Sequence, residues 1–317
     1  MSSCCLPPSA PGGGLGRQLP GGDATRHVPA STLVQAEREW VEIPGGEFTM
    51  GTDLPDGFPA DGEGPPRKVT LRPFRIAAIT VTNEQFAQFV RATGYITQAE
   101  EAGSSFVFYL QVPPQARAAI RRVPSGLPWW LEVGDACWQR PEGPGSHLRG
   151  RMDHPVVHVS WNDAQAYCEW AGASLPTEAQ WECAARGGLE QRRFPWGDEE
   201  PTAQRCNIWR GAFPNQPAEG WEPAPMPARS HAPNGFGLYN MSGNVWEWCA
   251  DAFHPHYHAI TPATDPLQAE PTGRRSMRGG SFLCHDSYCN RYRVAARGSN
   301  TPESSASNIG FRVAAQP

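Results

Sequence analysis

The sequence predicts an α+β fold with few helices, short strands and much ordered coil. Its 317 residues include 33 Gly and 33 Pro, which interrupt regular secondary structure along the whole chain. Only three segments combine the apolar spacing of a helix with a capping residue at the start and a Gly at the end. The strand-like segments are short and separated by Gly, Pro and Asn, and no fixed-period repeat is visible.

The N-terminal part predicts a tail followed by strands. Residues 1–37 are rich in Gly, Pro, Ser and Ala without periodic hydrophobicity, so we expect a disordered or extended tail before one domain over 38–317. Over 40–51, alternating apolar residues flank a Pro-Gly-Gly turn, which predicts a β-hairpin. Residues 52–66 should form a loop, and strand-like alternation returns over 67–76.

Three helices are expected, each opened by a capping Ser or Thr and closed by a Gly: 82–94, 160–172 and 177–187. In the third helix, Thr177 and Gln180 have the spacing of a capping box. From 188 to 280 the sequence consists mostly of short segments with few candidate strands.

Charge and composition exclude several functional classes. A net charge of −5 without a basic cluster argues against a nucleic-acid partner. No apolar run approaches the roughly 18–20 residues that span a bilayer, and the N-terminus lacks the pattern of a secretory signal. Nine Cys, an odd number in a long chain, fit a reducing compartment. We therefore expect a cytoplasmic monomer with neither a membrane nor a nucleic-acid partner.

Cys284 and Cys289 are the residues most suggestive of chemistry. They lie in a segment rich in polar and aromatic residues, and His285 directly follows the first of them. Arg291 and the other nearby arginines favour the thiolate, which is the form that attacks, is oxidised or binds soft metals. Two thiols at this spacing are also compatible with small core residues or with a disulfide.

The run Cys284-His-Asp-Ser-Tyr-Cys-Asn-Arg-Tyr-Arg-Val-Ala-Ala-Arg297 resembles the catalytic signature of the formylglycine-generating enzyme family, the family of sulfatase-modifying factors, in its bacterial form. Supporting motifs follow in the family's order, over 44–51, 154–163, 175–182, 240–248 and 300–312. The resemblance spans about residues 40–315 and implies a single irregular C-type-lectin-like domain. Several of these motifs recur in non-catalytic relatives, so the cysteine pair carries the inference of activity.

The resemblance implies a copper-dependent oxidase. Cys284 and Cys289 would hold Cu(I), a soft ion that prefers thiolates and accepts two ligands. The thiol of a substrate cysteine would then join them, and O₂ would oxidise that cysteine to formylglycine. The implied substrate is an unfolded sulfatase segment with the sequence Cys-x-Pro-x-Arg. Zinc is disfavoured because two Cys are too few for a closed tetrahedral site, whereas a disulfide or inert thiols remain alternatives.

The same resemblance assigns five further residues to the site: Ser281, Trp246, Tyr288, Asn308 and Arg297. Ser281 would face oxygen, Trp246 would form an aromatic wall, Tyr288 and Asn308 would line the substrate cleft, and Arg297 would lie buried near the site. Each also has an ordinary structural explanation, in the core, at a turn or in an internal ion pair.

Structural calcium is the second implied ion, since hard cations take oxygen ligands that loops can supply. The ligands of the first implied site are Asn207, the Ile208 carbonyl, Glu219 and the Trp221 carbonyl. Those of the second are Asn240, the carbonyls of Gly243 and Val245, and Glu247. The alternative is that these acids only accept hydrogen bonds from loop backbone.

Two rival functions and one feature of the tail complete the expectations. A non-catalytic lectin-like peptide-binding module is disfavoured by Cys284, Cys289 and Ser281 occurring together. A non-haem iron sulfoxide synthase is disfavoured because no His-x3-His-x-Glu motif is present. The segment Cys5-Leu-Pro-Pro-Ser9 resembles a degraded Cys-x-Pro-x-Arg target and suggests a pseudo-substrate, although a solvent-exposed linker is the simpler interpretation.

Overall fold

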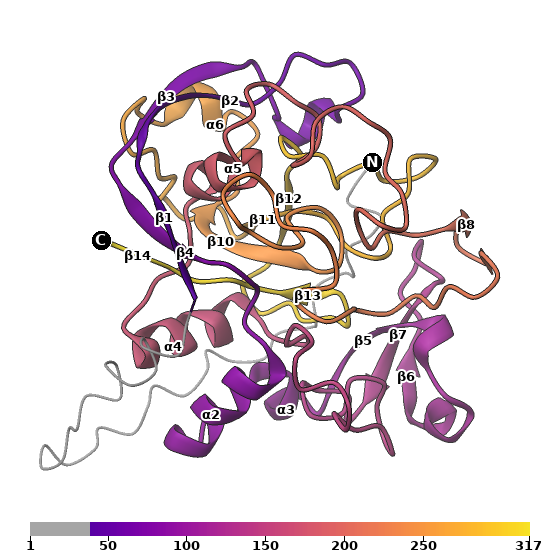
Figure 1. Ribbon diagram of the computed structural model, residues 1–317. Helices are drawn as coiled ribbons and strands as arrows, with labels where there is room; N and C mark the ends of the chain where they lie inside the picture. Colours follow the sequence, from indigo (N-terminus) through magenta and orange to yellow (C-terminus); the bar gives the residue numbers. More distant parts are fainter. Residues whose placement is uncertain (1–38) are drawn as a thin grey trace, which may run out of the picture.

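The computed structural model describes residues 39–317 (Figure 1). The predicted tail over 1–37, including the Cys5 segment, lies outside the described residues. The predicted domain boundary at residue 38 therefore stays a prediction.

The first four strands form one long, bent antiparallel ribbon: β1 (Trp40–Ile43), β2 (Gly46–Met50), β3 (Arg67–Leu71) and β4 (Phe74–Ala77). β1 pairs with β4, and β2 pairs with β3. The predicted hairpin over 40–51 is therefore wrong, because β1 and β2 follow one another along the same side of the ribbon. Gly45, at φ 74°, makes the bend, where a Cβ atom would lie 2.6 Å from the Leu71 carbonyl oxygen. The strand-like alternation predicted over 67–76 is confirmed as β3 and β4.

All three predicted helices are confirmed as α2 (Asn83–Thr93), α4 (Trp161–Ala171) and α5 (Glu178–Arg186). Each begins with a capping box and ends at a Gly in the left-handed conformation. The shorter helices were not predicted from the sequence: α3 (Gln98–Ala102), α6 (Tyr257–Ile260), and the 3₁₀ turns η1 (Pro59–Asp61), η2 (Tyr109–Gln111) and η3 (Pro114–Ala119).

The remaining strands are short. One sheet has the order β5-β7-β6, made of β5 (Ser104–Phe108), β7 (Trp130–Gly134) and β6 (Ile120–Arg122). A small hairpin joins β8 (Gly211–Ala212) to β9 (Gln216–Pro217). The last strand, β14 (Ala314–Ala315), adds to β4.

The central sheet positions the site. Its order is β12-β11-β10-β13, from β12 (Gly298–Asn300), β11 (Arg275–Arg278), β10 (Trp246–Ala252) and β13 (Ile309–Gly310). In Figure 1 this sheet lies in the middle of the molecule, with α5 on one side and α2, α3 and α4 on the other. Short strands, few helices and long ordered connections confirm the predicted α+β class.

Between residues 39 and 317, the structure contains no helix with the length and apolar character needed to cross a bilayer.

Candidate active site

Four of the residues predicted for the site flank strands of the central sheet. Trp246 begins β10, Ser281 follows β11 by three residues, Arg297 directly precedes β12, and Asn308 directly precedes β13. The sheet therefore gathers residues from three separate motifs at the ends of neighbouring strands.

Two successive turns bring the cysteines together. The Cys284 N–H donates to the Ser281 carbonyl at 2.9 Å, and the Cys289 N–H donates to the His285 carbonyl at 2.7 Å. Gly280, at φ 71°, permits the tight entry into the first turn, because a Cβ there would lie 2.8 Å from the Arg291 carbonyl oxygen.

The two sulfur atoms face each other across 3.5 Å. This distance is well beyond the about 2.05 Å of a disulfide, so the structure holds two thiols. Both residues have 0% exposure. Hydrogen-bond donors approach both sulfurs: the Ser281 backbone N–H lies 3.4 Å from Cys284 Sγ, and Arg291 Nη1 lies 3.6 Å from Cys289 Sγ.

Ser281, Asn308 and Trp246 form one hydrogen-bonded group beside the thiols. Asn308 Nδ2 donates to Ser281 Oγ at 3.0 Å, and the Trp246 backbone N–H donates to the Asn308 carbonyl at 2.8 Å. The Trp246 ring is fully buried, and its indole N–H has no hydrogen-bond partner within residues 39–317. The structure thus brings these three predicted residues together with the cysteine pair.

Tyr288 belongs to a half-buried aromatic cluster next to Cys289. Its ring stacks on Phe213 at 4.2 Å between centroids and meets Trp129 edge-on at 5.4 Å. Phe213 lies in the β8–β9 hairpin, and Tyr109 Oη holds this hairpin by donating to the Pro214 carbonyl at 3.2 Å. Phe213 lies between two very short strands, and Trp129 directly precedes β7. Neither belongs to a segment with periodic hydrophobicity, so the sequence did not indicate a role for them.

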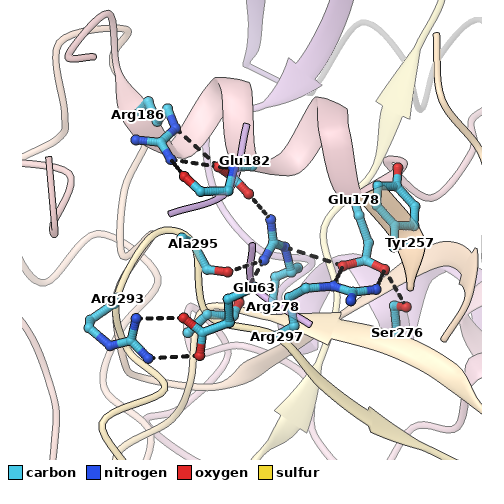
Figure 2. Close-up of polar contacts among 12 residues, drawn as sticks. Glu63, Glu178, Glu182, Arg186, Tyr257, Ser276, Arg278, Arg293, Ala295 and Arg297 are labelled. Carbon is cyan, nitrogen blue, oxygen red and sulfur yellow. Dashed lines mark hydrogen bonds and ion pairs between the residues drawn. The ribbon is translucent and has the colours of Figure 1, made fainter. Parts of the chain in front are cut away.

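Arg297 is buried, but it points into a different group of residues. Figure 2 shows the ion cluster, which we define as Glu178, Glu182, Arg186, Arg278 and Arg297. Arg297 donates from Nε and Nη2 to both carboxylate oxygens of Glu178, at 2.7 Å each. Arg278 binds Glu182 and lies 3.7 Å from Glu178. The structure therefore does not place the Arg297 guanidinium on the thiols.

Burial raises the pKa of both acids of this region, and neighbouring charges outweigh that effect at Glu178 but add to it at Asp251. Burial alone would raise the pKa of Glu178, but Arg297 and Arg278 outweigh it and hold that pKa below its ordinary value. Asp251 accepts the Glu178 backbone N–H at 2.7 Å and the Gln268 backbone N–H at 2.8 Å. Burial, together with the charge of Glu178, raises the pKa of Asp251.

The expected calcium ligands are only partly arranged for a cation. The side-chain carbonyl oxygens of Asn207 and Asn240 are buried and have no hydrogen-bond partner within the described chain, as expected for oxygens directed at an ion or water. Asn207 also forms an isolated bridge with Gly243, which joins the loops of the two implied sites. Ile208 and Val245 are buried beside them.

The two acids are less well suited. Glu219 is exposed, as is much of the loop before the half-buried Trp221. Glu247 is buried, but Arg312 donates to both of its oxygens at 2.6 and 2.8 Å, and Trp181 Nε1 donates to one at 2.7 Å. A cation at Glu247 would have to compete with the guanidinium of Arg312, so the residues present fit calcium through the two Asn oxygens and not through this carboxylate.

The cysteine pair does fit a soft monovalent metal. Its donor set is two thiols that already face each other, and within the described chain no group of three or more His, Cys, Asp or Glu forms a competing site for a metal ion.

Comparison with known proteins identifies the family. A family model described as the sulfatase-modifying factor enzyme 1-like domain matches residues 25–317. The chain belongs to this family. It is 55% identical over 296 residues to a formylglycine-generating enzyme of Thermomonospora curvata, covering 92% of this chain and 97% of that protein. The resemblance inferred from the sequence is thereby confirmed.

Two other relatives show the breadth of the family. An inactive C-alpha-formylglycine-generating enzyme 2 of Bos taurus is 45% identical over 279 residues, covering 86% of this chain and 87% of that protein. The solved structure of PvdO from Pseudomonas aeruginosa matches with a TM-score of 0.64 at 27% identity, covering 88% of this chain and 95% of that chain. Since family members differ in activity, the cysteine pair and not the fold must carry the functional argument.

Proposed function

We propose that this protein oxidises the cysteine of an unfolded Cys-x-Pro-x-Arg segment to formylglycine, as a copper-dependent oxidoreductase that uses O₂. The observation that carries the proposal is the pair of thiols on Cys284 and Cys289, 3.5 Å apart in a member of this family. Cu(I) bound by the two thiols would supply the activation of O₂.

The surrounding residues support this role by holding the pair and its oxygen-facing side in place. Ser281 Oγ accepts hydrogen bonds from both Asn308 Nδ2 and the Leu283 N–H, and these two donors fix the orientation of the Ser281 hydroxyl. The buried Trp246 excludes water from this side, which protects a thiolate and a reduced metal from side reactions.

The half-buried rings of Tyr288, Phe213 and Trp129 suit the substrate segment. Extended, proline-containing peptides dock against aromatic side chains because their conformation costs little entropy to fix. Tyr288 directly precedes Cys289 in the chain and its ring contacts the other two, so a proline close to the reacting cysteine is expected to meet them.

Because neither thiol has exposed surface, a substrate thiol reaches them only when a covering side chain moves. Asp286 and Ser287, in the segment between the two cysteines, are exposed, and His285 Nδ1 contacts Ser287 Oγ at 2.7 Å within the same turn. Binding of the peptide is therefore expected to displace side chains of residues 285–287.

The deciding experiment supplies the protein with Cu(I) and a Cys-x-Pro-x-Arg peptide in air and detects the aldehyde by mass spectrometry. Cys284→Ser and Cys289→Ser should each reduce aldehyde formation to the level of the blank. The matched control is Cys137→Ala, which alters another buried cysteine in a different part of the fold and should retain activity. Full activity in either serine variant would show that the metal ligands are misassigned.

The inactive relative in Bos taurus keeps one alternative open, a peptide-binding module without catalysis. The same peptide distinguishes the two functions, since a binding module would retain the peptide and form no aldehyde under any metal or oxygen condition.

We further propose that calcium stabilises the loops around Asn207 and Asn240, on the basis of their two buried side-chain oxygens. Removing calcium with a chelator should lower the unfolding temperature, because an ion present at about 100 times its Kd contributes about 2.7 kcal/mol. Asn240→Ala should abolish most of that calcium-dependent shift. An unchanged melting curve in chelator and in calcium would exclude structural calcium here.

A further inference from the structure

Arg291 has a tightly held side chain beside the thiols. It is 3% exposed, and contacts on different sides hold its guanidinium. Nη1 donates to Cys289 Sγ at 3.6 Å, Nε donates to Asp61 Oδ2 at 2.5 Å, and the guanidinium carbon lies 3.9 Å from the centre of the Phe58 ring. An ion pair on one edge and a ring on one face fix the guanidinium plane, so the remaining N–H groups have a set direction.

Asp61 is itself held from the opposite side. Its backbone N–H donates to the Phe58 carbonyl at 2.9 Å, and Arg297 Nη1 donates to the carbonyls of Asp61 at 2.8 Å and Gly62 at 3.1 Å. Gly62 packs so closely that a Cβ would lie 1.9 Å from the Pro255 carbonyl oxygen. Arg297 therefore acts on the thiols indirectly, by fixing the loop that carries the partner of Arg291.

The charges around the two sulfur atoms are unequal. Cys284 Sγ accepts a neutral backbone N–H from Ser281, whereas Cys289 Sγ accepts from the positively charged Arg291. Two thiolates and one monovalent cation have a net charge of −1, which is costly to bury without compensation. The guanidinium of Arg291 supplies one positive charge at that place, and its hydrogen bond to sulfur is charge-assisted.

From this geometry we propose that Arg291, oriented by Asp61 and Phe58, is a positioning residue that turns Cys289 Sγ toward Cys284 and balances the charge of a metal held between the two sulfurs. This inference rests on the proposed function for the identity of the metal. Residues that orient and polarise metal ligands typically change metal affinity about 10- to 100-fold when they are mutated.

The test measures the affinity of the metal-depleted full chain for Cu(I), by competition with a chromogenic Cu(I) chelator under anaerobic conditions. Arg291→Met should bind Cu(I) about 10- to 100-fold more weakly than wild type. Arg291→Lys, which keeps the positive charge, should recover part of that loss. Asp61→Asn should give an intermediate loss, because the guanidinium keeps its charge and loses its orientation.

The matched control is Arg293→Met. Arg293 is equally buried and follows two residues later, but its guanidinium donates to both oxygens of Glu63, at 2.6 and 2.8 Å, and to Asn290. Arg293→Met should destabilise the fold without changing the Cu(I) affinity of the folded protein. Thermal unfolding of each metal-free variant, measured in parallel, separates loss of folding from loss of the metal site.

Each outcome bears on the proposal. Wild-type Cu(I) affinity in folded Arg291→Met, or an equal loss in Arg293→Met, would overturn it. If the wild-type chain binds Cu(I) in an Arg291-dependent manner and forms no aldehyde, the inference stands and the proposed function fails. If it forms aldehyde while Arg291→Met binds Cu(I) normally, the function stands and the inference fails. Absence of Cu(I) binding by the wild-type chain would refute both.

Discussion

The thiol pair and the ion cluster are both buried and both involve arginines from the segment that follows Cys289, but they differ in charge balance. In the ion cluster, Glu178 and Glu182 are each approached by two guanidinium groups, and Arg278 is shared between them (Figure 2). At the thiol pair, hydrogen-bond donors from Ser281 and Arg291 approach the two sulfurs.

This difference separates a structural group from a functional one. A buried ion pair holds its surroundings in place, and removing one partner leaves an uncompensated charge. Hydrogen-bond donors around two sulfurs favour instead the negatively charged thiolates, which bind a cation. Mutations should therefore separate the two regions into one that governs catalysis and one that governs stability.

The largest expected effect is the loss of catalysis in Cys289→Ala without a comparable loss of folding. The change removes one buried sulfur, which should cost about 1 kcal/mol of unfolding free energy. Aldehyde formation should nevertheless disappear. Denaturant unfolding and the peptide assay on the same preparation check both values. If Cys289→Ala loses activity only because it unfolds, Cys289 has a structural role and not a catalytic one.

Glu178→Gln should produce the opposite result. It leaves Arg297, which is 1% exposed, without its charged partner and should cost about 3–5 kcal/mol of unfolding free energy. The folded fraction should retain most of its turnover at low temperature. Glu84→Gln, which breaks the exposed pair with Arg91, is the control and should cost about 0–1 kcal/mol. Equal losses in the two variants would contradict the structural role of the ion cluster.

The pH dependence of stability should reveal the raised pKa of Asp251. Burial, with the charge of Glu178 next to it, raises the pKa of Asp251 to about 7. A raised carboxyl pKa means that the folded state holds its proton more tightly than the unfolded state. The stabilisation of the folded state by the protonated Asp251 is fully present below the unfolded pKa of about 3.9 and is lost as the pH rises toward 7.

Asp251→Asn should therefore be less stable than wild type near pH 5, because the amide cannot accept both backbone N–H groups, from Glu178 and Gln268. The difference in unfolding free energy between Asp251→Asn and wild type should narrow by pH 8, because wild type has then lost the stabilisation from protonated Asp251. Denaturant unfolding across this range measures the effect, and parallel curves for the two proteins would argue against it.

The smallest expected effect lies at the rim of the thiol site. Phe213→Ala removes the ring that stacks on Tyr288, an aromatic contact worth about 0.5–1.5 kcal/mol. If the peptide uses this surface, KM should rise a few-fold while kcat changes little. Steady-state assays with the same peptide give both constants. A change confined to kcat would indicate that Phe213 orders the thiols and does not contact the substrate.

Local sequence signals predicted the helices and part of the site. Thr82, Ser160 and Thr177 marked helix starts, because a capping box is encoded within four consecutive residues. The cysteine pair and Ser281 were recognisable because they lie in one continuous motif. The same local reasoning failed at the Pro-Gly-Gly segment, where a bend within a ribbon and a hairpin turn have the same composition.

Contacts between distant segments could not be predicted in this way. Arg291, Arg293 and Arg297 look alike in sequence, yet Arg291 contacts a sulfur, whereas Arg293 pairs with Glu63 and Arg297 with Glu178. What distinguishes them is the position of Asp61 and Glu63, more than 200 residues earlier, in a loop whose sequence indicates only turns. The hydrogen bonds from Arg312 to Glu247 could not be predicted for the same reason.

The pairing of the last strands with early ones has a consequence for biosynthesis. β14 closes against β4, Asn308 bonds to Ser281, and Arg312 donates to the Ala77 carbonyl at 3.1 Å. A nascent chain whose residues from about 308 onward have not yet left the ribosome lacks these contacts. Under the proposed function, copper captured at that stage would meet two sulfurs without their finished surroundings, so the site is expected to form only after this segment has folded onto the early strands.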